Sequence, residues 1–153
     1  MKVDASGQMY LNRQTSVMAR PPGNYTIPGR DGIISGTWTT NTTGCHNIGN
    51  AWNNSGGIFT APITGRYLVQ WNVFLTNNTT RRDAYVKLNG SDVIREEIGD
   101  PEGTTGNNKS VSCQGVISMA ANDVLRFGAL TTGVTTVYSG VTPWSYCCVR
   151  LLG

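Results

Sequence analysis

The stretch Arg66-Tyr67-Leu68-Val69-Gln70-Trp71-Asn72-Val73-Phe74-Leu75-Thr76 alternates between two kinds of position. Successive side chains of an extended strand point to opposite faces. One face would carry Tyr67, Val69, Trp71, Val73 and Leu75, and the other Leu68, Gln70, Asn72, Phe74 and Thr76. The period of two predicts a β-strand whose wholly apolar first face lies in a core. Leu68 and Phe74 are unusual on a face that contacts water, so we expect the second face to meet another subunit.

The same period of two recurs along the chain, whereas no helical period is found. The first strand is expected over Met9 to Ala19, before the break at Pro21-Pro22-Gly23. The last run, Ser145 to Leu152, is apolar on both faces except at Arg150, which is typical of a strand in the middle of a covered sheet. About ten short strands at a spacing of roughly 8–12 residues predict an all-β sandwich or barrel.

Composition excludes several classes of protein. The chain has 153 residues, of which only 14% are charged, and a net charge of +3. This length fits one domain, and the basic residues are too few and too scattered to indicate a nucleic-acid partner. No apolar run approaches the roughly 18 residues of a membrane span, so we expect no membrane insertion.

The cysteines and the single histidine leave two interpretations open. Cys45 stands beside His46, and Cys113, Cys147 and Cys148 follow without any C-x-x-C spacing. These residues could form a zinc site, but free cysteines are more often small buried hydrophobes. Cys147 and Cys148 point to opposite faces of a strand and should not pair with each other. We expect no metal site and no cofactor, and the disulfide state stays undetermined.

The sequence also gives little support for a group of catalytic residues. A Cys45–His46 nucleophile pair would need an orienting partner, and none stands nearby in sequence. The carboxylates of Glu96, Glu97, Asp100 and Glu102 are typical of a solvated acidic loop rather than of an acid–base pair. We therefore expect that the protein is not an enzyme.

The segment Gly57-Ile58-Phe59-Thr60-Ala61-Pro62-Ile63-Thr64-Gly65-Arg66-Tyr67-Leu68-Val69 resembles the G-x-F-T-A-P-x-x-G-x-Y-x-F signature of complement C1q-like domains. Only the final aromatic residue differs, because Val69 stands in its place. Further similarity is found at Asn47 to Asn53, Ala84 to Asn89, Ser118 to Leu125 and Leu151-Leu152. The family's F-S-G before that ending is replaced by Cys147-Cys148-Val149, so the last strand should pack differently there.

The N-terminal segment shows a second, looser resemblance. Val3 to Tyr10 and Arg13 to Ala19 are similar to the lead-in of phage and marine virus structural proteins that end in a C1q-like domain. The Pro and Phe residues of that lead-in are missing here. We expect residues 1–32 to be an extended lead-in and first strand of the same domain, and residues 33–153 to be the C1q-like jelly roll.

The resemblance implies a ten-stranded jelly-roll β-sandwich, shared with tumour necrosis factor (TNF), that assembles as a homotrimer. In such a trimer the doubly apolar strands would face the threefold axis. The expected interface residues are Leu68, Phe74, Tyr146, Cys148 and Leu152. Some members of the family bind calcium near the trimer apex; here Asp83, Asp92, Asp100 and Glu102 offer oxygen ligands, although their spacing matches no calcium loop.

The function that the resemblance implies is attachment, by the tip of a virion fibre or related appendage, to a glycan or protein receptor on the host surface. Two alternatives are a structural trimerisation or capsid-decoration knob without a ligand, and a secreted C1q-like binding protein. The protein is thus expected on the virion surface, or otherwise outside the cell. Recognition should fall to loops, and the candidate ligand-binding residues are Arg81, Arg82, Asp100, Glu102, Tyr138 and Trp144.

Overall fold

A computed structural model describes residues 2–3, 9–10, 14–27, 30–76, 81–99, 108–138 and 144–153. Within these ranges the chain forms β-strands and no helix, so the all-β prediction is confirmed and no segment there could cross a membrane as a helix. The strands are β1 (Lys2–Val3), β2 (Met9–Tyr10), β3 (Ser16–Ala19), β4 (Tyr25–Ile27), β5 (Arg30–Ile33), β6 (His46–Ile48), β7 (Trp52–Asn53), β8 (Ile58–Thr60), β9 (Gly65–Thr76), β10 (Arg81–Leu88), β11 (Ser91–Gly99), β12 (Lys109–Met119), β13 (Val124–Thr131), β14 (Thr135–Val137) and β15 (Tyr146–Leu151).

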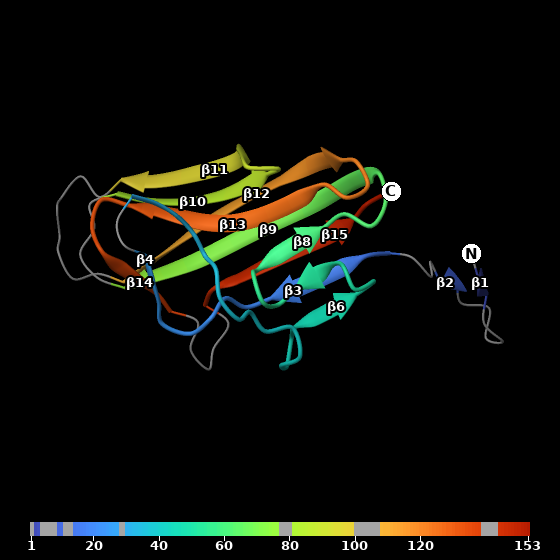
Figure 1. Ribbon diagram of the computed structural model, residues 1–153, viewed down its shortest axis with the longest axis horizontal. Helices are drawn as coiled ribbons and strands as arrows, with labels where there is room; N and C mark the ends of the chain where they lie inside the picture. Colours follow the sequence, from blue (N-terminus) through green and yellow to red (C-terminus); the bar gives the residue numbers. More distant parts are fainter. Residues whose placement is uncertain are drawn as a thin grey trace.

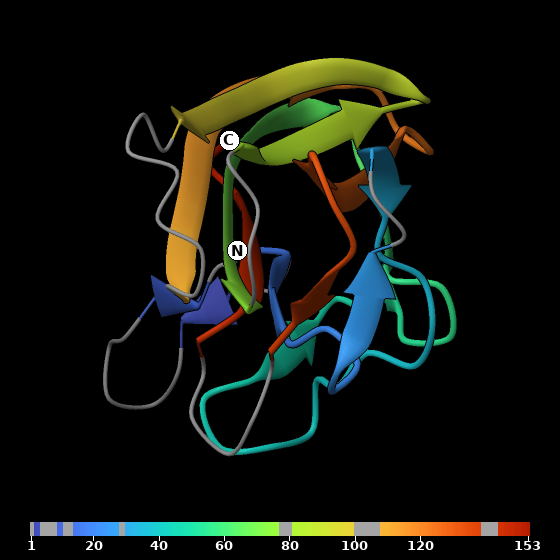
Figure 2. The same ribbon diagram turned by 90° about the vertical axis from the view of Figure 1, so that its left-hand side faces the viewer.

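Two antiparallel sheets pack face to face (Figure 1). The seven-stranded sheet has the order β4-β14-β9-β15-β3-β6, and β12 pairs with the other edge of β9. The six-stranded sheet has the order β11-β10-β13-β8-β7, and β5 also pairs with β13. Figure 2 shows β11 curving beside β12, which closes the sandwich along one edge. The frame β12-β9-β15-β3-β6 over β11-β10-β13-β8-β7 is a ten-stranded jelly roll, to which β4, β5 and β14 add short strands.

The core lies where the alternation of β9 predicts it. Its inward residues Tyr67, Val69, Trp71, Val73 and Leu75 are all at most 1% exposed. Trp38, Trp52, Trp71 and Phe127 form the aromatic centre of the core, with ring centroids 5.1 to 6.2 Å apart. The Trp71 indole Nε1 donates a hydrogen bond of 2.9 Å to the Gly128 carbonyl, so burial of this large ring leaves no donor unpaired.

The turn at Asn89-Gly90 joins β10 to β11, as the sequence predicts. Both residues have positive φ, 49° and 91°. The Asn89 side chain also donates to Asp123 Oδ1 (2.8 Å) and accepts from the Val124 N–H (2.9 Å). This hairpin turn is therefore tied to the turn between β12 and β13 at the same end of the sandwich.

The expectation of one strand over Met9 to Ala19 is wrong. Met9–Tyr10 pairs with Lys2–Val3 in a separate two-stranded sheet, and only Ser16–Ala19 joins the sandwich. The physical reason lies in burial, because β3 covers the core with Val17 and Ala19, both fully buried. Residues 11–13, between the two strands, lie outside the described residues.

Candidate functional site

The outward face of the seven-stranded sheet, called here the sheet face, is assembled from three long strands. Register places Leu68 of β9 between Arg150 and Val116, and Gln70 between Cys148 and Gln114. The sheet face comprises Leu68, Gln70, Asn72 and Phe74 of β9, Ser110, Ser112, Gln114 and Val116 of β12, Tyr146, Cys148 and Arg150 of β15, Ser16 and Met18 of β3, and His46 and Ile48 of β6.

The sheet face carries apolar groups that one chain does not cover. Leu68, Phe74, Tyr146 and Cys148, which the sequence assigns to a subunit interface, are only half-buried on it. Leu152, from the same prediction, follows β15 and is 50% exposed. Val116 and Ile48, exposed by 49% and 58%, are not among the predicted interface residues, because the residues two positions away from each, on the same strand face, are polar. Exposed apolar groups that gather on one face mark interaction surfaces; Val116 and Leu68 are direct neighbours here, whereas Arg150 and Ser16 separate them from Ile48.

A shallow hollow of about 360 Å³ lies in the middle of the sheet face. Its walls are polar: Gln70 Nε2 donates a hydrogen bond of 2.9 Å to Gln114 Oε1, and Asn72 and Ser112 lie beside this pair. Trp71, Cys113, Tyr146 and, from β11, Glu96 complete the lining. The sheet face is therefore apolar toward its ends and rich in amide groups at its centre.

Three aromatic side chains gather where β9 ends, and we call Phe74, Tyr138 and Trp144 the aromatic cluster. The ring centroids are separated by 4.7 Å (Phe74–Trp144), 5.2 Å (Tyr138–Trp144) and 6.3 Å (Phe74–Tyr138). Tilted contacts at such distances are favourable for aromatic pairs. Trp144 remains 44% exposed, so its ring offers a face to a ligand.

Hydrogen bonds made by the side chains of Ser145 and Asn72, and one between backbone groups, fix the main chain around the aromatic cluster. Ser145 Oγ accepts from the Phe74 N–H (2.9 Å) and donates to the Tyr138 carbonyl (2.8 Å). The Tyr138 N–H donates to the Phe74 carbonyl (3.0 Å), and Asn72 Nδ2 donates to the Trp144 carbonyl. The structure thus brings together two predicted ligand residues, Tyr138 and Trp144, with the predicted interface residue Phe74.

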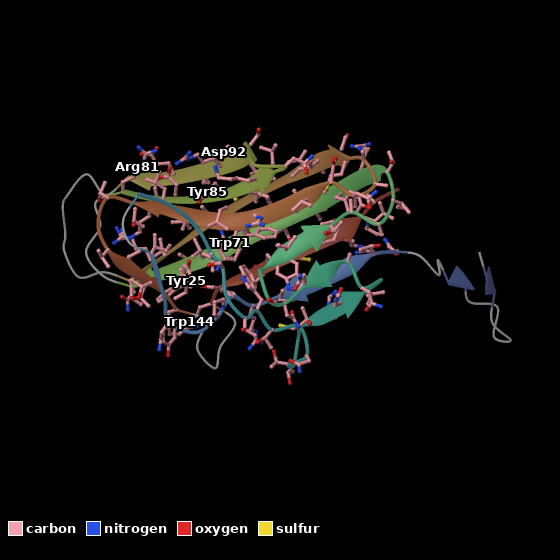
Figure 3. All side chains as sticks on the ribbon, viewed as in Figure 1. Tyr25, Trp71, Arg81, Tyr85, Asp92 and Trp144 are labelled. Carbon is pink, nitrogen blue, oxygen red and sulfur yellow. The ribbon has the colours of Figure 1, made fainter. Side chains whose placement is uncertain are left out.

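On the outer side of the six-stranded sheet lies the charged array, which comprises Arg81, Asp83, Lys87, Asp92, Arg95 and Glu97. Its centre is Asp83, whose side chain is 0% exposed. Arg81 donates to both Asp83 oxygens (2.9 Å each), and Arg95 Nε donates to Oδ2 (2.7 Å). Lys87 and Arg95 also lie over the Tyr85 ring, 5.2 and 5.6 Å from its centroid. Figure 3 shows Arg81, Tyr85 and Asp92 in this region, on the opposite side of the sandwich from Trp144.

We expect Asp83→Asn to lower the free energy of unfolding at pH 7 by about 2 kcal/mol. Removing one member of a buried ion pair costs about 3–5 kcal/mol, and the effect is reduced here because the arginine side chains are 41% and 35% exposed. Burial of Asp83 opposes ionisation, but hydrogen bonds from Arg81 and Arg95 outweigh it and hold the carboxyl pKa below its ordinary 3.8.

Asp83→Asn should also change how the free energy of unfolding depends on pH in the acid range. Because the folded-state pKa of Asp83 is depressed, its contribution is complete above the unfolded pKa and is lost as pH falls through the folded one. Urea titrations of the parent from pH 7 to pH 2 should show this loss below about pH 4, and Asp83→Asn should flatten it. Asp92→Asn, whose carboxylate is 35% exposed, serves as the control and should keep the parental profile. Identical acid profiles for the parent and Asp83→Asn would contradict the assignment.

The prediction that Arg82 binds a ligand is wrong, and Arg81 is less available to a ligand than predicted. Arg82 is 0% exposed, so it does not contact an external ligand. The sequence predicts a loop at Arg82, but β10 begins at Arg81, and its alternation turns Arg82 to the same face as Ala84 and Val86. The Arg81 guanidinium is held by Asp83 and by Glu97 (3.0 Å), which leaves less of it for an acidic ligand than the sequence suggests.

The two candidate calcium ligands that the structure describes, Asp83 and Asp92, are paired with basic side chains. Asp83 is held by two arginines, and Asp92 is held by Lys87 (2.7 Å) and Arg95 (2.9 Å), so basic groups occupy both carboxylates. Asp100 and Glu102 lie outside the described residues. In the part of the chain that the structure describes, no three His, Cys, Asp or Glu side chains gather in a way that could hold a metal ion.

The cysteines are all free thiols. Burial raises the pKa of Cys113 to about 12, with Glu96 adding to the effect, and burial also raises the pKa of Cys147 and of Cys148. Thiols with raised pKa are poor nucleophiles. His46 lies 2.8 Å from Ser16 Oγ, and among the described residues it has no carboxylate to orient its ring.

Comparison with solved structures identifies the fold as a TNF-like jelly roll, which confirms the predicted fold class. The crystal structure of murine APRIL at pH 5.0 has a TM-score of 0.68 at 14% sequence identity, covering 92% of this chain and 100% of that chain. Structures of murine APRIL at pH 8.0 and pH 8.5 match over the same shares with TM-scores of 0.67 and 0.66. No protein-family model and no curated protein sequence matches the chain.

Proposed function

We propose that this chain is a homotrimeric, non-catalytic binding module that attaches a virion to a receptor on the host surface, as the tip of a fibre or of a related appendage. The observation that carries the proposal is the sheet face, which leaves Val116 49% exposed beside the half-buried Leu68, and Ile48 58% exposed toward its β6 edge. A second and a third copy of the chain would remove these side chains from water. Burial of apolar area at about 25 cal/mol per Å² is the main driving force for such assembly.

Receptor binding is assigned to the aromatic cluster. Trp144 and Tyr138 lie beyond the end of β9, where the sheet face meets the end of the sandwich. An exposed indole ring stacks on the apolar face of a sugar ring or of a protein side chain, and its N–H can donate to a polar group. Because Ser145 fixes the backbone around the cluster, the rings are preorganised and lose little entropy on binding.

The test combines the oligomeric state with ligand binding. Light scattering on a size-exclusion peak should give three times the chain mass of 16.5 kDa. The labelled trimer should then bind a set of related glycans on an array, or cells of one host type in a panel. Trp144→Ala should weaken that binding at least about tenfold, as truncation of an interface tryptophan commonly does.

Ile63→Ala provides the matched control, since Ile63 is 39% exposed in the turn before β9 and lies away from the aromatic cluster. It should bind as the parent does. A trimer that binds neither glycans nor cells would support the structural-knob alternative instead. A parent that stays a monomer at micromolar concentration would refute the proposal altogether.

A further inference from the structure

A second pocket lies apart from the sheet face, the aromatic cluster and the charged array. It forms where the chain leaves β3, because Arg20 and Thr39 pair through two backbone hydrogen bonds of 3.0 Å. Figure 1 shows these two segments, after β3 and before β6, along the lower side of the molecule. The pocket has a volume of about 200 Å³ and is lined by Arg20, Pro21, Pro22, Gly23, Thr37, Thr39 and Thr42.

The Arg20 guanidinium is the one charged group of this pocket. Its Nη2 donates to the Thr43 carbonyl (2.9 Å), and its Nε is buried without a hydrogen-bond partner. Among the described residues no carboxylate pairs with it, in contrast to Arg81 and Arg95, which share Asp83. A guanidinium has five N–H donors; since Nε is buried and one Nη2 donor is used, three donors on the terminal nitrogens remain for an anion.

The walls of the pocket supply neutral groups. Thr37, Thr39 and Thr42 line it with hydroxyls that take no part in a hydrogen bond among the described residues, and Thr37 and Thr42 are exposed. A hydroxyl can both donate and accept, which matches the hydroxyls of a sugar ring. Pro22, which is half-buried, adds apolar surface of the kind that contacts ring C–H groups.

We propose that this pocket binds the carboxylate-bearing ring of an acidic sugar. The terminal nitrogens of Arg20 hold the carboxylate, the threonine hydroxyls bond the ring hydroxyls, and Pro22 packs on the ring. A single guanidinium, with no second cation in the lining, balances the single charge of a carboxylate better than the higher charge of a phosphate. The proposal goes beyond the proposed function, because it adds a second ligand site, for an acidic glycan, that is separate from the aromatic cluster.

The test uses the purified full chain and free sugars, followed by the ¹H–¹⁵N resonances of the backbone and of arginine Nε. Titration with sodium glucuronate and with N-acetylneuraminate should shift Arg20 Nε–H and the backbone amides of residues 37–43. Glucose, which lacks the carboxylate, should not shift them. Arg20→Gln should weaken binding of the acidic sugars at least about tenfold, the usual effect of removing a hydrogen bond to a charged group.

Arg66→Gln is the control, since Arg66 is an exposed arginine outside the pocket. It should leave both titrations unchanged. If Arg20→Gln fails to fold, Thr42→Val, which removes one exposed hydroxyl, should still weaken binding while preserving the parental spectrum.

Three results would overturn the proposal: no shift at Arg20 with either acidic sugar, equal affinity of Arg20→Gln and the parent, or binding of glucose 6-sulfate in the absence of binding of the carboxylates. None of these depends on receptor binding through Trp144. Failure of this pocket and failure of the attachment function are therefore distinguishable.

Discussion

Gly57→Ala is expected to lower the free energy of unfolding by about 4 kcal/mol, through backbone strain of about 1–2 kcal/mol and overpacking of about 1–3 kcal/mol. Gly57 has a φ of +61°, in the left-handed region that residues with a Cβ adopt at a penalty. A Cβ at this position would lie less than 3.0 Å from three atoms of the Trp38 indole. Equilibrium unfolding in guanidinium chloride, followed by tryptophan fluorescence, measures the loss.

Trp38 cannot move aside to admit that Cβ. Its ring is 1% exposed and contacts Trp52 (5.1 Å between centroids) and Trp71 (5.7 Å). Its Nε1 also donates to the Ile34 carbonyl (3.3 Å). Displacement of the ring would therefore disturb the aromatic centre of the core, where packing is as dense as in an organic crystal.

Gly90→Ala separates the two contributions. Gly90 also has a positive φ, +91°, but a Cβ there would meet no atom within 4 Å. This variant should lose only the backbone term, about 1 kcal/mol. Equal losses for Gly57→Ala and Gly90→Ala would show that Trp38 accommodates the methyl group, contrary to the packing argument.

The fold could be predicted from sequence because its signals are local. The alternation from Tyr67 to Leu75 identifies β9 and its core face, and Asn89-Gly90 identifies the hairpin of β10 and β11. The start of β10 could not be found in the same way. Arg82 is a charged residue after a polar stretch, which is typical of a turn, and its burial depends on coverage by the rest of the sandwich.

The candidate sites depend on contacts between distant parts of the chain. Tyr138 reaches Phe74 because β14 pairs with the end of β9, and no local pattern specifies that register. The pocket at Arg20 likewise requires the bridge to Thr39. In sequence, Arg20 is one of nine scattered arginines, and nothing distinguishes it before the chain is folded.

The largest effect on assembly is expected for Val116→Asp, which should convert the proposed trimer into a monomer of 16.5 kDa at micromolar concentration. Val116 pairs in register with Leu68 on the sheet face and is 49% exposed, so the aspartate would remain hydrated in an isolated chain. In a trimer each copy would bury this carboxylate without a partner, at about 3 kcal/mol or more per site. Phe74→Asp tests the same face less cleanly, because Phe74 also packs on Tyr138 and Trp144 within its own chain.

Val134→Asp is the matched control, because it places the same charge on an exposed valine in the turn between β13 and β14. Val134 is 66% exposed, and its substitution should leave the trimer intact. Light scattering and sedimentation velocity on the parent and both variants, with circular dichroism to establish that each is folded, give the comparison. A folded Val116→Asp that keeps the parental mass would place the subunit contact elsewhere. If Val134→Asp also dissociates, added negative charge rather than burial at the sheet face is responsible, and the argument from exposed apolar side chains fails.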